Sequence, residues 1–422
     1  MTNASSIPQL EATPSTATNV STRPELEGKR VGMVVFSPYP ADPRPRRAAE
    51  ALMAQGMIVD YICEGDDKTP KRELVGSLDV TRAPISHWRG GKLAYFYQYF
   101  SFIAFSAFVL AWRSLHRRYD LVYIHNMPDV LVFSALFPKL LGAKVILDEH
   151  DPMPELMTTI FNLEERSLSV RIVRWLEKWS LARANVVIAV NVACKRIFSE
   201  RSCPIEKIGV VMNSPDEEIF RYRAANSYPL REPDGSPFVI MYHGSLVERN
   251  GVDLAVEALA LIKDSIPTVE LRIFGKQTEF LDRVMEKVCE LGLEQKARYM
   301  GSRRLEDLVT EIEACDVGVI PNQRNAFTDI NTPTRIFEYL ALGKPVVAPR
   351  TPGIQDYFDG DSLFFFDSGN AEQLAEKILY AYSHPRECRE IAERGQEVYQ
   401  FHTWRKERET LVSVVSELLV TK

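Results

Sequence analysis

Residues 331–349 constrain this chain more than any other segment, because they read NTPTRIFEYLALGKPVVAP. A Pro-containing loop, a short helix and an apolar strand follow one another there, and this order is typical of an α/β fold. Pro333 and Thr334 suit the first turn of the helix. Gly343 suits a left-handed cap at its end, before PVVA enters a sheet. We therefore expect an α/β protein with the start of this helix at a loop.

The start of this helix has the chemistry of an anion site. Free backbone N–H groups there favour anions, and Arg335 adds a positive charge in the first turn, where it opposes the helix dipole. Glu338, one turn further on, has a carboxylate that can accept two hydrogen bonds from a ribose diol. These residues predict a nucleotide pocket. The alternative is a surface helix with an ordinary Arg and Glu.

The other apolar runs of the C-terminal half end in Gly or Pro loops. PFVIMYHG ends at Gly244, VELRIFG at Gly275, ARYMG at Gly301 and CDVGVIP at Pro321. Ligands bind at the carboxyl ends of the strands in an open parallel sheet, so we expect these loops to share one edge. Gly244 lets the backbone approach a ligand closely, whereas His243 is expected to pack rather than to react.

The N-terminal half opens as a βαβ unit. RVGMVVFSP is a short apolar run, a helix pattern follows it, and MIVDYIC is the second strand. The loop SPYPADPRPRR has no GxGxxG, so NAD binding is disfavoured. Two later strands lead into polar loops, one with His125 and Asn126 and the other with His150 and Asp151. Both loops follow strand carboxyl ends, so we expect them to point into one crevice.

On these residues the chain resembles the retaining glycosyltransferases of family 4, which have the GT-B fold. The resemblance rests on the Pro-Thr-basic start of the helix, the Glu within FEY, the GKPVVA strand and the segment NSPDEEIF. It implies two facing Rossmann-like domains with an interdomain cleft. The C-terminal domain would bind a nucleotide diphosphate-sugar and the N-terminal one an acceptor, with closure over both. It also implies transfer with retention, without an essential metal or a cofactor.

The sugar contact departs from the family pattern. The family has two glutamates seven residues apart; the second holds the ribose and the first a hydroxyl of the transferred sugar. Glu338 matches the second glutamate. The first falls at Ile330, so Asp329 or Asn331 is expected to contact the sugar instead.

The diphosphate clamp departs from the pattern as well. Where the family has an Arg at the start of one loop and a Lys near its end, this chain has Ser245 and Asn250. Arg249 is the cation left in that loop. The breaking bond leaves negative charge on a phosphate oxygen, so we expect Arg249 and Arg335 to act as the replacement pair. His150 matches the family histidine that contacts the donor sugar near the reacting carbon.

The expected site therefore has three groups of residues. The catalytic group is His150, Arg249 and Arg335. The donor-binding group is Gly244, Ser245, Gly275, Gly301, Asp329, Asn331, Thr332, Pro333, Thr334 and Glu338. The acceptor-side group is Arg44, Arg46, Arg47, His125, Asn126 and Asp151. Its three arginines would meet an acceptor phosphate, or else lie solvated at a helix start. No metal site is expected.

Two helical segments of the N-terminal half have the composition of membrane-surface helices. The uncharged run from Leu93 to Trp112 is long enough to span a membrane. We do not expect it to do so, because a crossing there would place strands of one parallel sheet on opposite sides of the bilayer. Its small or polar stripe is expected to pack on the domain: Ala94, Gln98, Ser101, Ala104, Ala107 and Ala111. The second segment combines basic residues with Trp and Ile, as interfacial helices do: Arg171, Ile172, Arg174, Trp175, Lys178 and Trp179. Two ordinary core helices are the alternative.

Composition sets further limits. The first 26 residues are rich in Ser, Thr, Pro and Asn without a sustained apolar run or a signal pattern, so a disordered tail and a cytoplasmic protein are expected. The six cysteines lack CxxC spacing, which argues against zinc and disulfides. The first 223 residues carry 28 Lys and Arg against 25 Asp and Glu, and the remainder 23 against 32. The acidic balance disfavours nucleic acid, while the basic half suits an anionic membrane.

The expected organisation is a tail at 1–26, an acceptor domain at 27–220, a donor domain at 233–395 and a helix at 396–422 that crosses back. The expected function is hexosyl transfer to a lipid-linked saccharide in bacterial exopolysaccharide or lipopolysaccharide assembly, at the inner face of the cell membrane. Two alternatives remain. A nucleotide-sugar epimerase would need further acid and base carboxylates, and a catalytically silent partner subunit is suggested by Ile330, Ser245 and Asn250.

Overall fold

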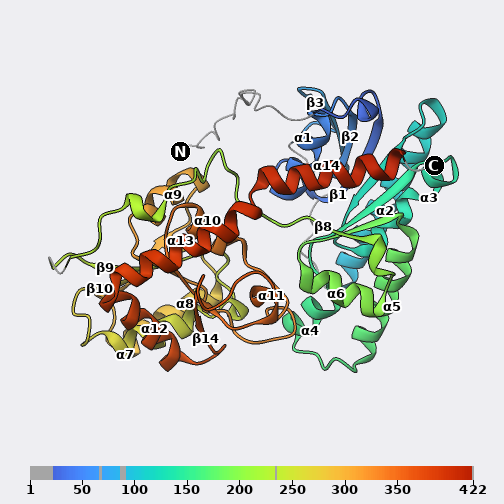
Figure 1. Ribbon diagram of the computed structural model, residues 1–422. Coiled ribbons are helices and arrows are strands. Elements are labelled where there is room, and N and C mark those ends of the chain that lie inside the picture. Colours follow the sequence, from blue (N-terminus) through green and yellow to red (C-terminus); the bar gives the residue numbers. More distant parts are fainter. Residues whose placement is uncertain (1–21, 66–68, 86–91, 233–234, 421–422) are drawn as a thin grey trace, which may run out of the picture.

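The computed structural model describes residues 22–65, 69–85, 92–232 and 235–420 of the 422-residue chain. Two α/β domains lie side by side (Figure 1). Each domain is built on a mainly parallel sheet, so the predicted fold class is confirmed. The predicted apolar runs form the central strands because both faces of each sheet are covered by helices.

The N-terminal domain has an eight-stranded sheet in the order β3-β4-β2-β1-β5-β6-β7-β8, and only the β3–β4 pair is antiparallel. Its strands are β1 (Arg30–Pro38), β2 (Ile58–Glu64), β3 (Arg72–Val75), β4 (Leu78–Ala83), β5 (Leu121–His125), β6 (Lys144–Glu149), β7 (Val186–Ala189) and β8 (Ile208–Val210). Its helices are η1 (Pro24–Leu26), α1 (Pro43–Met53), α2 (Lys92–His116), η2 (Asp129–Ala135), α3 (Leu136–Leu140), α4 (Met153–Phe161), α5 (Leu168–Arg183), α6 (Val192–Arg201) and η3 (Ile205–Lys207).

The C-terminal domain has a six-stranded parallel sheet in the order β11-β10-β9-β12-β13-β14. Its strands are β9 (Phe238–His243), β10 (Val269–Phe274), β11 (Ala297–Gly301), β12 (Val317–Val319), β13 (Val346–Pro349) and β14 (Phe364–Phe366). Its helices are η4 (Ala225–Ser227), η5 (Glu248–Asn250), α7 (Val252–Ile262), α8 (Glu279–Glu290), α9 (Leu305–Glu313), α10 (Thr334–Ala341), α11 (Pro352–Gln355), α12 (Ala371–Ser383) and α13 (Pro385–Phe401).

The last helix, α14 (Trp404–Val420), lies on the N-terminal domain (Figure 1). Leu411 and Val415 are buried in the same core as the strands of that domain, and Glu407 accepts a hydrogen bond from the backbone N–H of Met212 at 2.7 Å. The domain also begins earlier than predicted. Leu26 is fully buried, so the expected tail cannot extend to residue 26, and its first 21 residues lie outside the described part.

The domains touch through the loop that precedes α10. Asn191 of the N-terminal domain donates hydrogen bonds to the Ile330 carbonyl at 2.8 Å and to the Thr332 hydroxyl at 3.2 Å. The Ile330 side chain packs on the N-terminal core. Arg196 forms an ion pair with Asp356 at 2.7 Å. The position expected to carry a sugar-binding glutamate is therefore part of the domain contact.

Helix α2 faces the domain with a different stripe from the predicted one. The buried residues recur every fourth position: Gln98, Phe102, Ser106, Leu110 and Ser114. Of the predicted stripe only Gln98 is buried; Ala104 is exposed, Ser101, Ala107 and Ala111 are half-buried, and the Ala94 side chain lies outside the described part. Four aromatic side chains face outward, since Tyr97, Phe100, Phe108 and Trp112 are all more than half exposed, whereas Phe102 is buried. None of the helices among the described residues combines the length and hydropathy needed to cross a membrane.

Candidate functional site

A cavity of about 590 Å³ opens between the domains at the carboxyl ends of the C-terminal strands. The loops after β9, β10 and β11 and the start of α10 line it, together with Asp151 from the N-terminal domain. Ten predicted residues meet there: Asp151, Gly244, Ser245, Arg249, Gly275, Asn331, Pro333, Thr334, Arg335 and Glu338. We call this space the donor cavity.

Arg335 is fixed at one wall of the donor cavity. Its guanidinium donates to the Tyr242 hydroxyl at 3.0 Å, to the His243 carbonyl at 3.2 Å and to Asn322 Oδ1 at 2.9 Å. Its Nε is buried without a partner among the described residues. A side chain at Gly244, where φ is +128°, would meet the Arg335 guanidinium at 2.6 Å. Glycine there lets the strand end and this cation lie against each other.

In the loop after β9, Ser245 and Asn250 stand where the family has cations, and a hydrogen bond joins them. Asn250 donates from Nδ2 to the Ser245 carbonyl at 2.7 Å, and the Tyr242 hydroxyl donates to the same oxygen at 2.8 Å. Arg249 lies with its guanidinium 5.8 Å from the centre of the Phe327 ring. Burial raises the pKa of Asp151 to about 6, and Arg249 acts to lower it. Arg249 and Arg335 are thus both on the donor cavity, as predicted from the loop sequences.

Glu338 and the buried His243 form a pair at another wall, with the Glu338 side chain 15% exposed. The two side chains approach to 3.4 Å between Glu338 Oε2 and His243 Nε2. Burial raises the pKa of Glu338 to about 7 against the opposing charges of Arg335 and Arg47. Burial, with Arg335, lowers the pKa of His243 to about 3. Glu338 therefore changes charge near neutral pH next to a neutral imidazole, and it can accept hydrogen bonds from a ligand when ionised.

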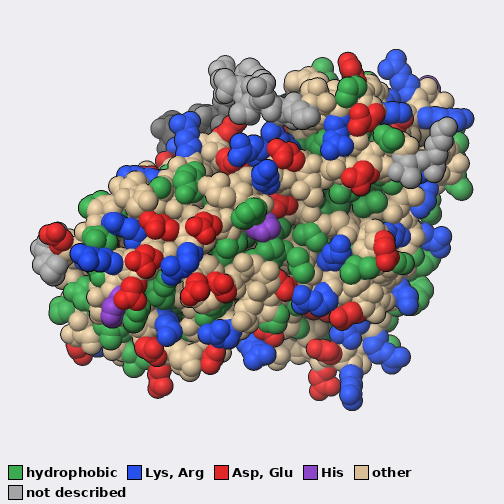
Figure 2. Space-filling model, viewed as in Figure 1, with side chains coloured by type: hydrophobic (Ala, Val, Ile, Leu, Met, Phe, Trp, Pro, Cys, Tyr) green, Lys and Arg blue, Asp and Glu red, His purple; other side chains and the backbone are tan. Residues whose placement is uncertain are grey.

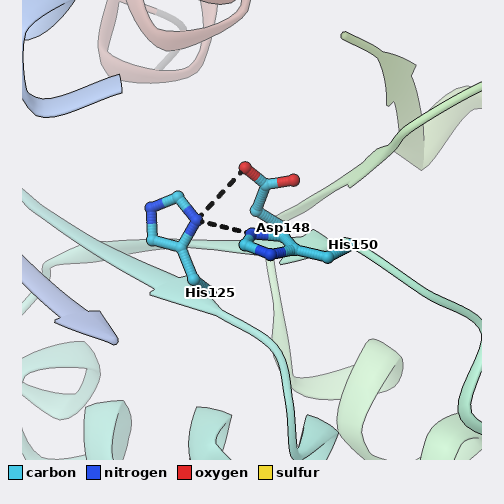
Figure 3. Close-up of side chains that lie close together, drawn as sticks. All are labelled: His125, Asp148 and His150. Atoms are coloured by element: carbon cyan, nitrogen blue, oxygen red, sulfur yellow. Dashed lines mark hydrogen bonds and ion pairs between the residues drawn. The ribbon is translucent and has the colours of Figure 1, made fainter. Parts of the chain in front are cut away.

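His150 lies in a chain of buried side chains at the N-terminal side of the cleft. His125 Nδ1 is 2.9 Å from His150 Nε2 and 3.4 Å from Asp148 Oδ2 (Figure 3). Burial lowers the pKa of both histidines, so both are neutral at pH 7. The backbone N–H of His150 donates to Asn126 Oδ1 at 2.8 Å. His125 and Asn126 are buried, so they hold the 150–151 loop rather than face the crevice as predicted.

His125, Asp148 and His150 bring their ligand atoms within 4.8 Å of one another, which is close enough for a metal ion. The chemistry of the donor set does not fit one. Asp148 already accepts from Arg44 Nη2 at 2.6 Å and from the Tyr123 hydroxyl at 2.9 Å. Burial acts to raise the pKa of Asp148, but Arg44 outweighs it and the net shift is downward. A cation already neutralises the only carboxylate of this cluster.

The predicted acceptor arginines do not form a phosphate site. Arg44 is buried against Asp148 and donates to the Val211 carbonyl. Arg47 is buried, donates to the Ser214 carbonyl at 2.6 Å and lies 4.5 Å from the Trp404 ring centre. Arg46 is partly exposed, 3.9 Å from a carboxylate on the same helix. The DPRPRR turn therefore ties α1 to the β8 loop and to α14 instead of presenting three free cations.

Three predicted donor residues lie outside the lining of the donor cavity. Asp329 lines a neighbouring cavity and pairs with Arg324 at 3.3 Å. Thr332 donates to the Gly353 carbonyl and lines a small pocket with His150. Gly301 ends β11, and the next residue, rather than Gly301, reaches the cavity. Of the two residues offered in place of the glutamate absent at Ile330, the structure therefore favours Asn331.

Sequence reasoning missed several residues of the donor cavity, among them two cations and an aromatic ring. Lys276 follows the Gly275 loop, Arg303 follows the Gly301 loop, and Phe327 lies two residues before Asp329. Two signals could have revealed the cations, since the strand ends read FGK and MGSRR. Basic residues after a strand at the ligand edge point toward an anion. Phe327 carries no such local signal.

Models of two glycosyltransferase domains match the chain. The model of group 1 glycosyl transferases matches residues 228–398, and that of a glycosyl transferase 4-like domain matches residues 41–214. An amylovoran biosynthesis glycosyltransferase of Erwinia amylovora is 25% identical over 42% of this chain and 42% of its own. The sulfoquinovosyl transferase of Arabidopsis thaliana is 24% identical over 68% of this chain and 54% of its own. The chain thus spans about half the length of these curated relatives.

Solved structures share the fold over most of the chain. Sucrose-phosphate synthase of Thermosynechococcus elongatus superposes with a TM-score of 0.74 at 18% identity, covering 93% of this chain and 100% of its own. HepE of Anabaena, solved in complex with UDP and glucose, superposes with a TM-score of 0.66 at 16% sequence identity. The match covers 92% of this chain and 100% of the HepE chain. Both halves match glycosyltransferase domains and the whole chain has the fold of these enzymes. The chain therefore has the GT-B fold, and its two halves are similar to two glycosyltransferase domains.

Proposed function

We propose that the chain is a retaining transferase that moves a sugar from a nucleotide diphosphate-sugar to a lipid-linked saccharide in polysaccharide assembly. One observation supports the donor part of this proposal: Arg249, Arg335 and the carboxyl of Glu338 line the same cavity. Two cations suit a diphosphate, and a carboxylate suits a ribose diol. HepE, whose fold is shared, was solved with UDP-glucose.

The proposed reaction needs charge stabilisation rather than a protein nucleophile. The bond between the sugar carbon and the phosphate oxygen breaks, and a bond from that carbon to the acceptor oxygen forms on the same face. The acceptor proton passes to the departing phosphate oxygen. Arg335 and Arg249 stabilise the charge that develops there. Lys276 and Arg303, which line the same cavity, would add to the positive potential around the diphosphate.

Two measurements test this function. A thermal-shift screen of nucleotide-sugars identifies the donor, because a ligand that binds the native state raises its stability. NMR of the product then gives its anomeric configuration. Retention supports the proposal, and inversion contradicts it. Release of the free nucleotide diphosphate without acceptor separates a transferase from a silent subunit, and a change of donor configuration without transfer would indicate an epimerase.

The pKa of Glu338 predicts how donor affinity depends on pH. The ionised carboxylate accepts both ribose hydrogen bonds, and protonation removes that capacity. A pKa of about 7 therefore makes binding weaker as the pH falls through neutrality. UDP-glucose, which has no group of its own titrating in this range, should bind about tenfold more tightly at about pH 8 than at about pH 6 by calorimetry. Glu338→Gln should abolish the pH dependence of donor affinity. An equal pH dependence in this variant would show that Glu338 is not the titrating group.

The lipid-linked acceptor and a peripheral position at the inner face of the cell membrane rest on the surface of the N-terminal domain. Helix α5 exposes Ile172, Trp175 and Trp179, with Arg171 and Lys178 exposed among them. Figure 2 shows hydrophobic and basic side chains mixed along the right-hand edge, over this domain. Aromatic and basic residues on one helical face suit the interface of an anionic bilayer.

A quadruple variant tests this surface. Trp175→Ala and Trp179→Ala with Arg171→Glu and Arg174→Glu should abolish co-sedimentation with phosphatidylglycerol vesicles. Each basic residue near such a surface contributes about 1 kcal/mol, and the aromatic anchors are lost as well. Wild type should bind, and salt should release part of it. Leu261→Ala, an exposed leucine of the other domain, is the control. Vesicle binding by the quadruple variant, or none by wild type, would contradict the membrane proposal.

A further inference from the structure

A second cavity, of about 250 Å³, lies between the domains beside the donor cavity. Glu155 and Thr158 of α4, Arg174 of α5 and Glu200 of α6 line it from the N-terminal domain, and Asp329 does so from the other. We call it the α4 cavity. Figure 1 shows α4 between α5 and the C-terminal domain.

One short loop separates the two cavities. Phe327 lines the donor cavity, whereas Ala326 and Asp329 line the α4 cavity. The loop is attached to α4, because Thr159 Oγ1 donates to Asn325 Oδ1 at 3.0 Å across the domain boundary. A molecule in the α4 cavity therefore lies one chain thickness from a bound donor.

The charges around the α4 cavity do not suit an anion. Arg201 at its floor is held by Glu155 at 2.6 Å and by the buried Glu177 at 2.6 Å. Arg174 faces another carboxylate at 3.4 Å. Asp329 and Glu200 add two more carboxylates, so acidic groups outnumber basic ones. A phosphate or a sugar acid would be repelled there.

The α4 cavity nevertheless has unused hydrogen-bonding capacity. Asp329 Oδ1, an acceptor, and Arg174 Nε, a donor, are buried and have no partner among the described residues. Buried polar atoms without a partner are uncommon in native proteins and indicate a ligand or water. Both atoms are closed to a water-sized group in this conformation, so a sugar hydroxyl, which donates and accepts, would reach them after the Asp329 and Arg174 side chains turn toward the cavity.

The α4 cavity also lies next to the surface proposed to meet the membrane. Helix α4 ends at Ile160 and Phe161, which are 53% and 56% exposed. Helix α5 contributes Arg174 to the cavity and exposes Trp175 and Ile172 outward. A lipid-linked saccharide could therefore leave its lipid at this apolar edge and extend its sugar into the cleft.

We propose that the α4 cavity is an outer acceptor subsite and that it binds a neutral, uncharged sugar residue of the acceptor other than the one that reacts. This inference rests on the proposed transferase function. Asp329, which was predicted to bind the donor, is reassigned to the acceptor. The residues of this cavity, rather than the arginines of the α1 turn, then contact the acceptor. Any phosphate that links the acceptor sugar to its lipid lies outside this cavity.

The test fills the cavity from its rim. Glu200 is exposed at the end of α6, so Glu200→Trp should block the cavity without disturbing a core. Glu206→Trp, an exposed position that does not line it, is the matched control. Thr158→Trp fills the cavity from the opposite wall. The probes are the octyl glycosides of glucose, galactose, mannose and N-acetylglucosamine, each mixed with UDP and followed by saturation-transfer NMR.

At least one glycoside should receive saturation from wild type and from Glu206→Trp. Its signal should fall at least about tenfold in Glu200→Trp and in Thr158→Trp, while the UDP signal stays unchanged. Inorganic phosphate should not displace the glycoside. The inference is overturned if no glycoside binds wild type, if binding survives both filling variants, or if phosphate competes. Loss of the UDP signal from wild type would instead defeat the proposed donor function.

Discussion

Replacing Arg335 by Ala is expected to lower kcat for sugar transfer by about 10²- to 10³-fold, with a smaller effect on KM for the donor. Arg335 is held by Tyr242, Asn322 and a backbone carbonyl, so it is preorganised at one wall of the donor cavity, where we propose the diphosphate binds. A fixed donor aimed at developing charge acts mainly in the transition state, and its loss has this magnitude in other enzymes. Steady-state kinetics at saturating donor measures the effect.

Two variants make this result interpretable. Arg335→Lys keeps the positive charge but loses the planar guanidinium that makes three hydrogen bonds, so the variant should retain part of the activity. Arg350→Ala removes a half-exposed arginine of the same domain that does not line the cavity, and its kcat should match wild type. A loss confined to KM would show that Arg335 binds the ground state and the transition state equally.

Replacing Glu338 by Ala should weaken donor binding by about 10- to 100-fold while the fold persists. The Glu338 side chain is 15% exposed, and His243 Nε2 is 3.4 Å from its Oε2. Because the His243 imidazole is neutral, the variant leaves no unpaired charge behind. Hydrogen bonds to a charged group contribute about 1.5–3 kcal/mol, which corresponds to roughly a 10- to 100-fold weaker Kd. Calorimetry with UDP gives the affinity, and circular dichroism checks the fold.

Glu376→Ala is the control for Glu338→Ala, because Glu376 lies on an outer helix of the same domain with its side chain 67% exposed. Its affinity for UDP should equal that of wild type. Unchanged affinity in Glu338→Ala would mean that the ribose is held elsewhere and that the α10 carboxylate is structural.

The fold and the donor cavity were largely predictable from local sequence. Apolar runs predicted most strands of both sheets, although β3, β4 and β14 were not predicted. In the C-terminal half these runs end in Gly or Pro, and ligand sites in parallel sheets lie at such strand ends. Gly244 and Arg335 line the same cavity, as the strand ends predict, although they are far apart in sequence. Most residues of the donor cavity could be predicted from this rule alone, without knowledge of long-range packing.

The acceptor side was harder to predict because its residues take their partners from distant segments. The partner of Arg44 is Asp148, 104 positions away, and that of Arg47 is the carbonyl of Ser214, 167 positions away. No local pattern shows that an arginine will be buried by such a partner. Whether Asp329 lines the donor cavity or the α4 cavity depends on how the 325–330 loop packs against α4. These outcomes are set by tertiary contacts and could not be read from motifs.

The place where the chain passes between the domains limits how they can move. It passes twice, once after β8 and again between α13 and α14 (Figure 1). The two passages are joined, because Ser214 Oγ donates to the His402 carbonyl at 2.5 Å and Met212 donates to Glu407. Two neighbouring, cross-linked passages act as one hinge, so opening is a rotation about a single axis. Points far from an axis move most, which means that loading and release of ligands widen the α4 side of the cleft more than the passages themselves.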